Sequence, residues 1–227
     1  MTISPPLLRA HREKLRQTLD IKVPFIATGY QAMQLSGDMA VRFLQQADFF
    51  WLTGIAEPGW QLLLLKEEYL VRPQRSHEES LFDGGISDAE ATAISGVKNV
   101  ISSDTAKELL EKQRAAGISK VYTAGGDAPY LKGSFTLNPA ARVLRRHLEK
   151  QFDEVEDVRP ILARLRALKD TEEVALQRNA LAATIEGFTT LKSKLHTLRY
   201  EYEAEAELSY IFRKKGTEGH AYEPIVA

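Results

Sequence analysis

The sequence contains no cysteine. Disulfides and thiolate metal sites are therefore excluded, and the composition fits a reducing compartment. Neither sign of charge predominates, because 30 lysines and arginines are balanced by 31 aspartates and glutamates, which gives a formal net charge of -1. A chain without a global basic field is not expected to bind nucleic acid or an anionic membrane surface.

Long apolar runs are missing as well. The longest, such as residues 62–65, are far too short to span a bilayer. Residues 1–6 have neither the basic start nor the apolar core of a signal peptide. We therefore expect a cytoplasmic protein with no membrane partner.

Several catalytic motifs are absent: GxSxG, GxxxxGK[ST], GxGxxG and HExxH do not occur. No two of the histidines have the i, i+4 spacing of helical metal ligands. We expect His11 and His147 to lie on solvated helical surfaces and His196 in an exposed loop between helices. His77 is expected in a polar turn beside two glutamates. We interpret these residues as part of the turn and not as a metal site.

The first two thirds of the chain alternate short apolar segments with amphipathic ones, which predicts an α/β domain. Phe49, Phe50, Trp51 and Trp60 are interpreted as core aromatics. The predicted elements are a helix from Pro5, a strand at 22–27, a hairpin of 61–65 and 69–72, a helix at 104–116, a strand at 119–124 and a helix from Pro139.

A composition shift marks a domain boundary. Between residues 153 and 158 four acids alternate with two valines, which predicts a half-buried edge strand with a charged outer face. Arg159-Pro160 then breaks the pattern. We place the domains at 1–157 and 158–227.

The second domain begins with helical patterns. A short helix is expected at 161–168, and Asp170 with Glu173 predicts a capping box that starts the next helix. A further helix is expected at 200–215, with acids near its start and bases near its end. Residues 219–227 end on an apolar run, which indicates a strand cut from its sheet. The predicted buried stripe of the longer helix is Leu181, Ile185, Phe188 and Leu191.

Two blocks of sequence carry a family resemblance. The first is Val41-Arg42-Phe43 followed by ADFFWLTGIAEP at 47–58, and the second runs from Arg159-Pro160 through LKDTEE at 168–173 to the closing Ile-Val-Ala. These residues resemble aminopeptidase P, of the pita-bread, creatinase-like metallopeptidases. The resemblance implies an α/β fold: a creatinase-like N-terminal domain with a mixed sheet and flanking helices, then the first helices and first strand of a pita-bread α+β domain.

The same resemblance implies a function. The family binds two divalent metals, often manganese, through two Asp, one His and two Glu, and none of those motif positions occurs before Ala227. We therefore expect the N-terminal portion of a metal-dependent Xaa-Pro aminopeptidase, inactive alone, with no catalytic or metal-binding residue of its own. Its partners would be short peptides with proline in second position, and it would form a homodimer or homotetramer.

Two residues are candidates for substrate contact. By resemblance, Tyr222 falls at a position that lines the active-site pocket, and His220 would share its strand face by period-two alternation. The alternatives are a core tyrosine and a hydrogen-bonded histidine. For the whole protein, a non-catalytic peptide- or protein-binding module and the related dipeptidase prolidase also stay open.

Overall fold

The computed structural model describes residues 3–20, 22–76, 84–125 and 138–226. The chain divides into two compact units, Thr2–Leu168 and Lys169–Ala227, called here the first unit and the second unit. None of the described helices combines the length and the apolarity that crossing a membrane requires.

A six-stranded mixed sheet forms the centre of the first unit, as far as this unit is described, with the order β6-β5-β4-β1-β7-β8. Strands β4 and β5 form the predicted antiparallel hairpin, with Gln61 opposite Val71. Strand β8 lies at the edge of the sheet, as the acidic alternation predicts. The strands are β1 (Phe25–Thr28), β4 (Gln61–Leu64), β5 (Glu68–Val71), β6 (Asn99–Ile101), β7 (Lys120–Thr123) and β8 (Glu154–Asp157).

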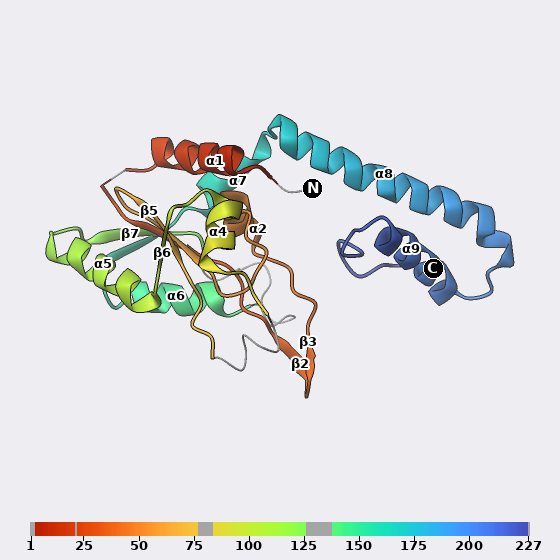
Figure 1. Cartoon of the computed structure of the whole chain (residues 1–227), viewed down its shortest axis with the longest axis horizontal. Helices are drawn as coiled ribbons and strands as arrows, with labels where there is room; N and C mark the ends of the chain where they lie inside the picture. The colour runs from red at the N-terminus through yellow and green to blue at the C-terminus, as the bar shows by residue number, and fades with distance from the viewer. Residues whose placement is uncertain (1–2, 21, 77–83, 126–137, 227) are drawn as a thin grey trace. The chain divides into compact units, whose positions relative to one another are not determined.

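Helices cover both faces of this sheet (Figure 1). Successive strand residues point to opposite faces, so Phe25 packs in one hydrophobic cluster and its neighbour Ile26 in the other. Helices α1, α2, α4 and α7 contribute to the first cluster, and α5 and α6 to the second. Their bounds are α1 Pro5–Thr18, α2 Ala47–Thr53, α4 Asp88–Ser95, α5 Ser103–Ala115, α6 Ala140–Leu148 and α7 Arg159–Ala167. The expected mixed α/β architecture is confirmed.

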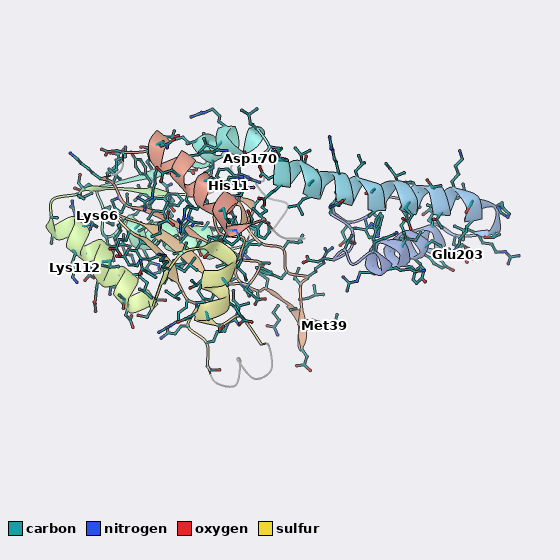
Figure 2. All side chains as sticks on the ribbon, turned by 45° about the horizontal axis from the view of Figure 1, so that its top comes forward. His11, Met39, Lys66, Lys112, Asp170 and Glu203 are labelled. Atoms are coloured by element: carbon teal, nitrogen blue, oxygen red, sulfur yellow. The ribbon has the colours of Figure 1, made fainter. Side chains whose placement is uncertain are left out.

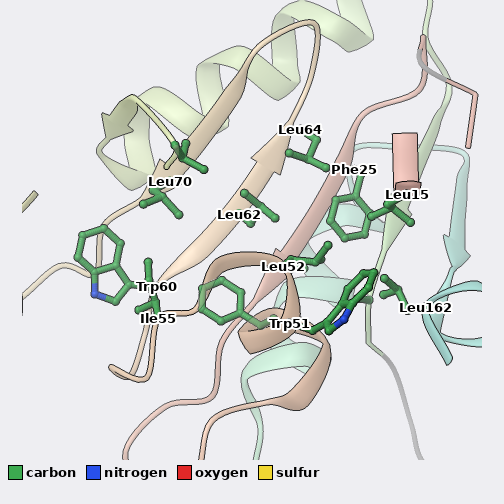
Figure 3. Close-up of a cluster of buried hydrophobic side chains, with 14 of the residues drawn as sticks. Leu15, Phe25, Trp51, Leu52, Ile55, Trp60, Leu62, Leu64, Leu70 and Leu162 are labelled. Atoms are coloured by element: carbon green, nitrogen blue, oxygen red, sulfur yellow. The ribbon is translucent and has the colours of Figure 1, made fainter. Parts of the chain in front are cut away.

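The aromatic block of the sequence lies in the core (Figure 3). Phe49, Trp51 and Trp60 are buried, as predicted, while Phe50 is partly buried. Two of the buried rings belong to the short helix α2, which is held against the sheet by these side chains. Such large buried rings contribute much of a core's hydrophobic stabilisation.

The prediction that His11 is solvated is wrong. His11 lies on α1 (Figure 2), is fully buried, and stacks on Trp51 with ring centroids 4.0 Å apart. Its Nδ1 lies 2.9 Å from the carbonyl oxygen of Trp51. The sequence neighbours of His11 are charged, but the buried face of α1 comprises Leu8, His11, Arg12 and Leu15, which recur at i, i+3, i+4 and i+7 and so share one helix face.

Arg12 joins four elements of the first unit. Its Nε donates to Glu68 at 2.8 Å, and its Nη1 donates to the carbonyls of Leu52 at 2.8 Å and Ser95 at 3.1 Å. These carbonyls lie in the last turns of α2 and α4, where a cation is favourable. Burial lowers the pKa of the Arg12 guanidinium, and the Glu68 carboxylate acts in the opposite direction.

Helix α7 packs within the first unit. Val158 and Leu162 are fully buried in the cluster that also holds Trp51 and Leu15. Along the chain, the division between the two compact units therefore falls between Leu168 and Lys169. The family domain boundary after Asp157 stays a prediction.

In its described residues the second unit consists of α8 (Thr171–Lys194), the short 3-10 helix η2 (Leu195–Thr197) and α9 (Glu201–Lys214). The capping box is confirmed, since the backbone N–H of Asp170 donates to Glu173 at 2.9 Å. Helices α8 and α9 approach each other closely at Gly187, where a Cβ would lie 2.8 Å from Cε1 of Phe212.

Two predictions for the second unit are wrong. Leu181, Ile185 and Phe188 are 58%, 57% and 58% exposed, and in α8 only Gly187 is buried. Among the described elements α8 packs mainly against α9, and one helix covers only a narrow part of the surface of another, so the wider apolar stripe stays exposed. Residues 219–226 form no strand, because a strand needs a neighbouring edge and none pairs with them in the described chain.

Candidate functional site

The second unit holds an apolar groove with a volume of about 590 Å³. One wall comes from α8, another from α9, and the segment after α9 closes the third side. The lining residues are Ala180, Ala183, Thr184, Phe188 and Leu191 of α8, Ala204, Leu208 and Phe212 of α9, and Thr217, Gly219, His220, Ala221, Tyr222, Pro224, Ile225 and Val226. A concave apolar surface with few polar groups is the usual form of a ligand site.

His220 fixes the segment that follows α9. Its Nε2 lies 2.8 Å from the hydroxyl of Ser209, and its ring meets Phe212 edge-on at 5.1 Å and 70°. Thr217 adds a further tie, because its hydroxyl donates to the carbonyl of Phe212 at 2.9 Å. These contacts place His220 in the groove wall as a hydrogen-bonded histidine.

Tyr222 lies at the rim of the same groove and is 79% exposed. The structure thus brings the two predicted site residues together on one groove, though not on one strand face. A solvent-facing tyrosine can stack its ring on a ligand and offer its hydroxyl as donor or acceptor.

The groove is not suited to the chemistry of a metal pair. Hard divalent ions such as manganese take carboxylate and other oxygen ligands, and the described residues lining the groove include one imidazole and no carboxylate. The arrangement can bind an apolar side chain or ring, but it supplies no group set that activates a water.

The sequence does not predict the role of three residues at the groove. Phe212 and Phe188 line it, although Phe188 is expected in a buried stripe, and Ser209 forms a hydrogen bond with His220. The helical recurrence of Leu208 and Phe212 was the available signal for the α9 wall. Of the other histidines, His147 and His196 are exposed as predicted, and His77 lies outside the described residues.

A mixed sheet with helices on both faces, followed by a helical pair, defines an α/β fold in two compact units. The family described as "Aminopeptidase P, N-terminal domain" matches residues 8–122, about half of the chain. The chain belongs to the aminopeptidase P family.

Named relatives agree with this assignment. The Xaa-Pro aminopeptidase of Escherichia coli K12 is 26% identical over an alignment of 208 residues, and the match covers 84% of this chain and 45% of that protein. The Xaa-Pro aminopeptidase of Haemophilus influenzae is 26% identical over an alignment of 200 residues, and the match covers 85% of this chain and 44% of that protein. This chain thus spans less than half the length of these relatives.

Solved structures show the same fold. A Bacillus anthracis structure assigned to aminopeptidase P superposes with a TM-score of 0.81 at 26% identity, over 97% of this chain and 54% of that chain. Escherichia coli aminopeptidase P with the inhibitor Pro-Leu gives a TM-score of 0.75 at 23% identity, over 95% of this chain and 51% of that chain. The expected N-terminal fold with a mixed sheet and flanking helices is confirmed.

Proposed function

We propose that this chain is the N-terminal portion of a metal-dependent Xaa-Pro aminopeptidase that removes an N-terminal residue preceding proline. The carrying observation is the family match over residues 8–122, together with curated relatives named Xaa-Pro aminopeptidase. The substrates would be short peptides with proline in second position. The protein would act in the cytoplasm, as a homodimer or homotetramer.

In this proposal the metal ligands lie outside the present chain. The groove of the second unit has no carboxylate to hold a pair of divalent metals, whether manganese or another. The chain alone would therefore lack peptidase activity, with no catalytic and no metal-binding residue of its own. A pair of metals in the parent enzyme would activate a water for attack on the peptide bond.

The activity of the chain alone tests this directly. Purified residues 1–227 would be assayed with Xaa-Pro-Xaa tripeptides and Xaa-Pro dipeptides in excess manganese, and we expect no release of the N-terminal residue. A mock-purified sample is the control. Turnover above this control would show that the chain carries its own catalytic centre.

The same assay on the longer parent enzyme separates the alternatives. Cleavage of the dipeptide but not of the tripeptide would indicate a prolidase, and cleavage of neither would indicate a binding module.

Tyr222 and His220 are the residues we propose for substrate contact. In the parent enzyme, Tyr222→Phe removes only the hydroxyl, so ring packing and fold are retained. If the hydroxyl contacts the peptide, kcat/KM on a proline tripeptide falls by up to roughly 100-fold, the equivalent of a polar contact worth about 1–3 kcal/mol. Tyr210→Phe, an exposed tyrosine of α9 that does not line the groove, is the matched control. Unchanged kcat/KM with intact metal content would remove Tyr222 from the site.

A further inference from the structure

The segment that follows α9 turns back on this helix (Figure 1). Thr217 ties the start of the segment to the helix through its backbone and its side chain. Its N–H and its hydroxyl both donate to the carbonyl of Phe212, at 3.2 and 2.9 Å. Its carbonyl accepts from Nη1 of Arg213 at 2.8 Å, and its hydroxyl accepts from the N–H of Gly219 at 3.3 Å. These bonds hold the chain as far as Gly219 and stop short of Tyr222.

His220 is the last residue before Tyr222 that is tied to α9. Its Nε2 lies 2.8 Å from the hydroxyl of Ser209, and its ring meets Phe212 edge-on. Among the described residues 221–226, none forms a hydrogen bond. Tyr222 lines the groove and is therefore placed by the tie at His220, and not by a hydrogen bond of its own.

The hydroxyl of Ser209 has a different partner from most hydroxyls inside helices. A serine or threonine there often bonds the carbonyl four residues back, as Thr184 and Thr189 of α8 do at 3.0 and 2.7 Å. The hydroxyl of Ser209 bonds the imidazole of His220 instead. Ser209 does not itself line the groove, so its effect on a bound ligand passes through His220.

We propose that Ser209 is a positioning residue, which through His220 holds Tyr222 at the rim of the groove, where the tyrosine ring covers one side of a bound apolar side chain or proline ring. Leu208 and Phe212 supply an apolar wall for the same ligand. A site that is assembled for only a fraction of the time binds more weakly in proportion to that fraction. The kind of ligand rests on the proposed function, whereas the tie between Ser209 and His220 does not.

Three variants separate the hydroxyl from the rest of the side chain. Ser209→Ala removes the hydrogen bond and leaves the ring of His220 its contact with Phe212. Ser209→Thr keeps a hydroxyl at the same position and should behave like the wild type. Ser193→Ala is the matched control, because the hydroxyl of Ser193 donates to the carbonyl of Thr190 within α8 at 2.7 Å. One intramolecular hydrogen bond changes an equilibrium constant by roughly three- to tenfold, once competition from water is included.

Limited proteolysis of the full 227-residue chain with chymotrypsin measures the tie without any peptidase activity of the chain itself. A protease binds several residues on either side of the cut, so cleavage after Tyr222 requires His220 to leave Ser209. When opening and closing are fast, the rate of cleavage follows the population of the open form. We expect Ser209→Ala to raise the rate of cleavage after Tyr222 by roughly three- to tenfold, and Ser209→Thr and Ser193→Ala to stay within about twofold of the wild type. Cleavage after the exposed Tyr202, identified by mass spectrometry, is the internal reference.

Three results of the proteolysis would overturn the proposal. The first is an unchanged rate in Ser209→Ala. The second is an equal rise in Ser209→Thr, because the hydroxyl would then not be the group that holds the segment. The third is an equal rise at Tyr202 and Tyr222, which would indicate a general loss of stability of α9 and not the release of one segment.

The kinetics of the longer parent enzyme on a proline tripeptide test the consequence at the groove. Ser209→Ala should raise KM by roughly three- to tenfold and leave kcat within about twofold, because Ser209 acts on ligand binding alone. In a Tyr222→Ala background the same change should have little further effect, since two residues that act as one unit are not additive. Additive effects, or a fall in kcat alone, would overturn the positioning role and leave the proposed function intact. A parent that cleaves no peptide would refute the proposed function, and the proteolysis alone would then decide the role of Ser209.

Discussion

The two units use the same kinds of residues with different results. In the first unit, strands and helices bury Phe49, Trp51 and Leu162 in a shared cluster. In the second unit, α8 turns Leu181, Ile185 and Phe188 largely toward solvent, and the described buried apolar residues are Ala204, Leu208 and Ile211 of α9. Amphipathic patterning therefore states which face of a helix is apolar, whereas burial requires a second surface wide enough to cover it.

The comparison predicts that only one of the units folds by itself. We expect a fragment of residues 2–168 to unfold cooperatively in urea, with a free energy of unfolding in the range of about 5–15 kcal/mol typical of a domain. A fragment of residues 169–227 should show no cooperative transition, because two helices with one narrow contact bury too little apolar surface. A cooperative transition in residues 169–227 would remove the distinction between the units.

A shorter fragment sharpens the same test. Ending the first fragment at Asp157 removes the fully buried Val158 and Leu162. Loss of buried aliphatic side chains costs roughly 2–5 kcal/mol each for large residues. We expect residues 2–157 to be less stable than residues 2–168 by at least about 3 kcal/mol, and equal stability would mean that α7 is not part of this folding unit.

Arg12 is expected to be the most sensitive polar side chain of the first unit. Arg12→Met leaves the Glu68 carboxylate and the carbonyls of Leu52 and Ser95 without their donor. Glu68 is partly exposed and keeps Arg16 at 3.6 Å, so the cost comes mainly from the two buried carbonyls, at about 1–3 kcal/mol for each buried acceptor that loses its partner. The matched control is Arg9→Met on the exposed face of α1, which should change the free energy of unfolding by less than about 0.5 kcal/mol. Similar values for the two variants would contradict the capping role of Arg12.

A pair of aromatic truncations compares the units side chain for side chain. Trp51→Ala removes a ring that is buried against His11 and should destabilise the full chain by roughly 3–5 kcal/mol. Phe188→Ala removes a ring that is mostly exposed, and its cost should stay near about 0.5 kcal/mol. Urea unfolding followed by circular dichroism measures both. A large effect at Phe188 would indicate that this face of α8 is covered.

Local signals in the sequence are sufficient to predict most of the helices and strands. The β4–β5 hairpin, the edge strand β8 and the capping box of α8 follow from alternation, turn residues and side-chain pairs within a few positions. The failures involve contacts between distant residues. His11 was assigned to the surface because its neighbours are charged, although α1 packs against α2.

The candidate site shows the same limit. Tyr222 and His220 were found through family resemblance, and the structure places both on one groove. Residues 219–226 were expected to form the strand that carries them, but these described residues form none, because pairing depends on a partner edge that a single segment does not specify. The hydrogen bond between Ser209 and His220 crosses a turn whose path no local pattern predicts.

The smallest expected effect concerns the capping box, a feature that helices of both units share. Helix α4 begins with a capping box in which the Ser87 backbone N–H donates to Glu90 at 2.8 Å and the Ser87 hydroxyl donates at 2.7 Å, as Asp170 and Glu173 cap α8. The hydrogen bonds from Ser87, the backbone bond first, lower the pKa of Glu90. A carboxyl with a lowered folded-state pKa contributes stability that is present above its unfolded pKa and is lost as pH falls through the folded value.

Glu90→Gln keeps an oxygen that can accept from Ser87 but removes the titration. We therefore expect the wild-type chain to be slightly more stable than the variant at pH 7, and the difference in melting temperature to shrink as pH falls below about 4.5. Glu111→Gln, on the exposed face of α5, is the control for the removal of one surface carboxylate. A difference that stays constant between pH 7 and pH 3 would contradict the linkage. Because the same kind of cap starts α4 and α8, capping cannot account for the contrast between the units, and the burial of apolar faces must.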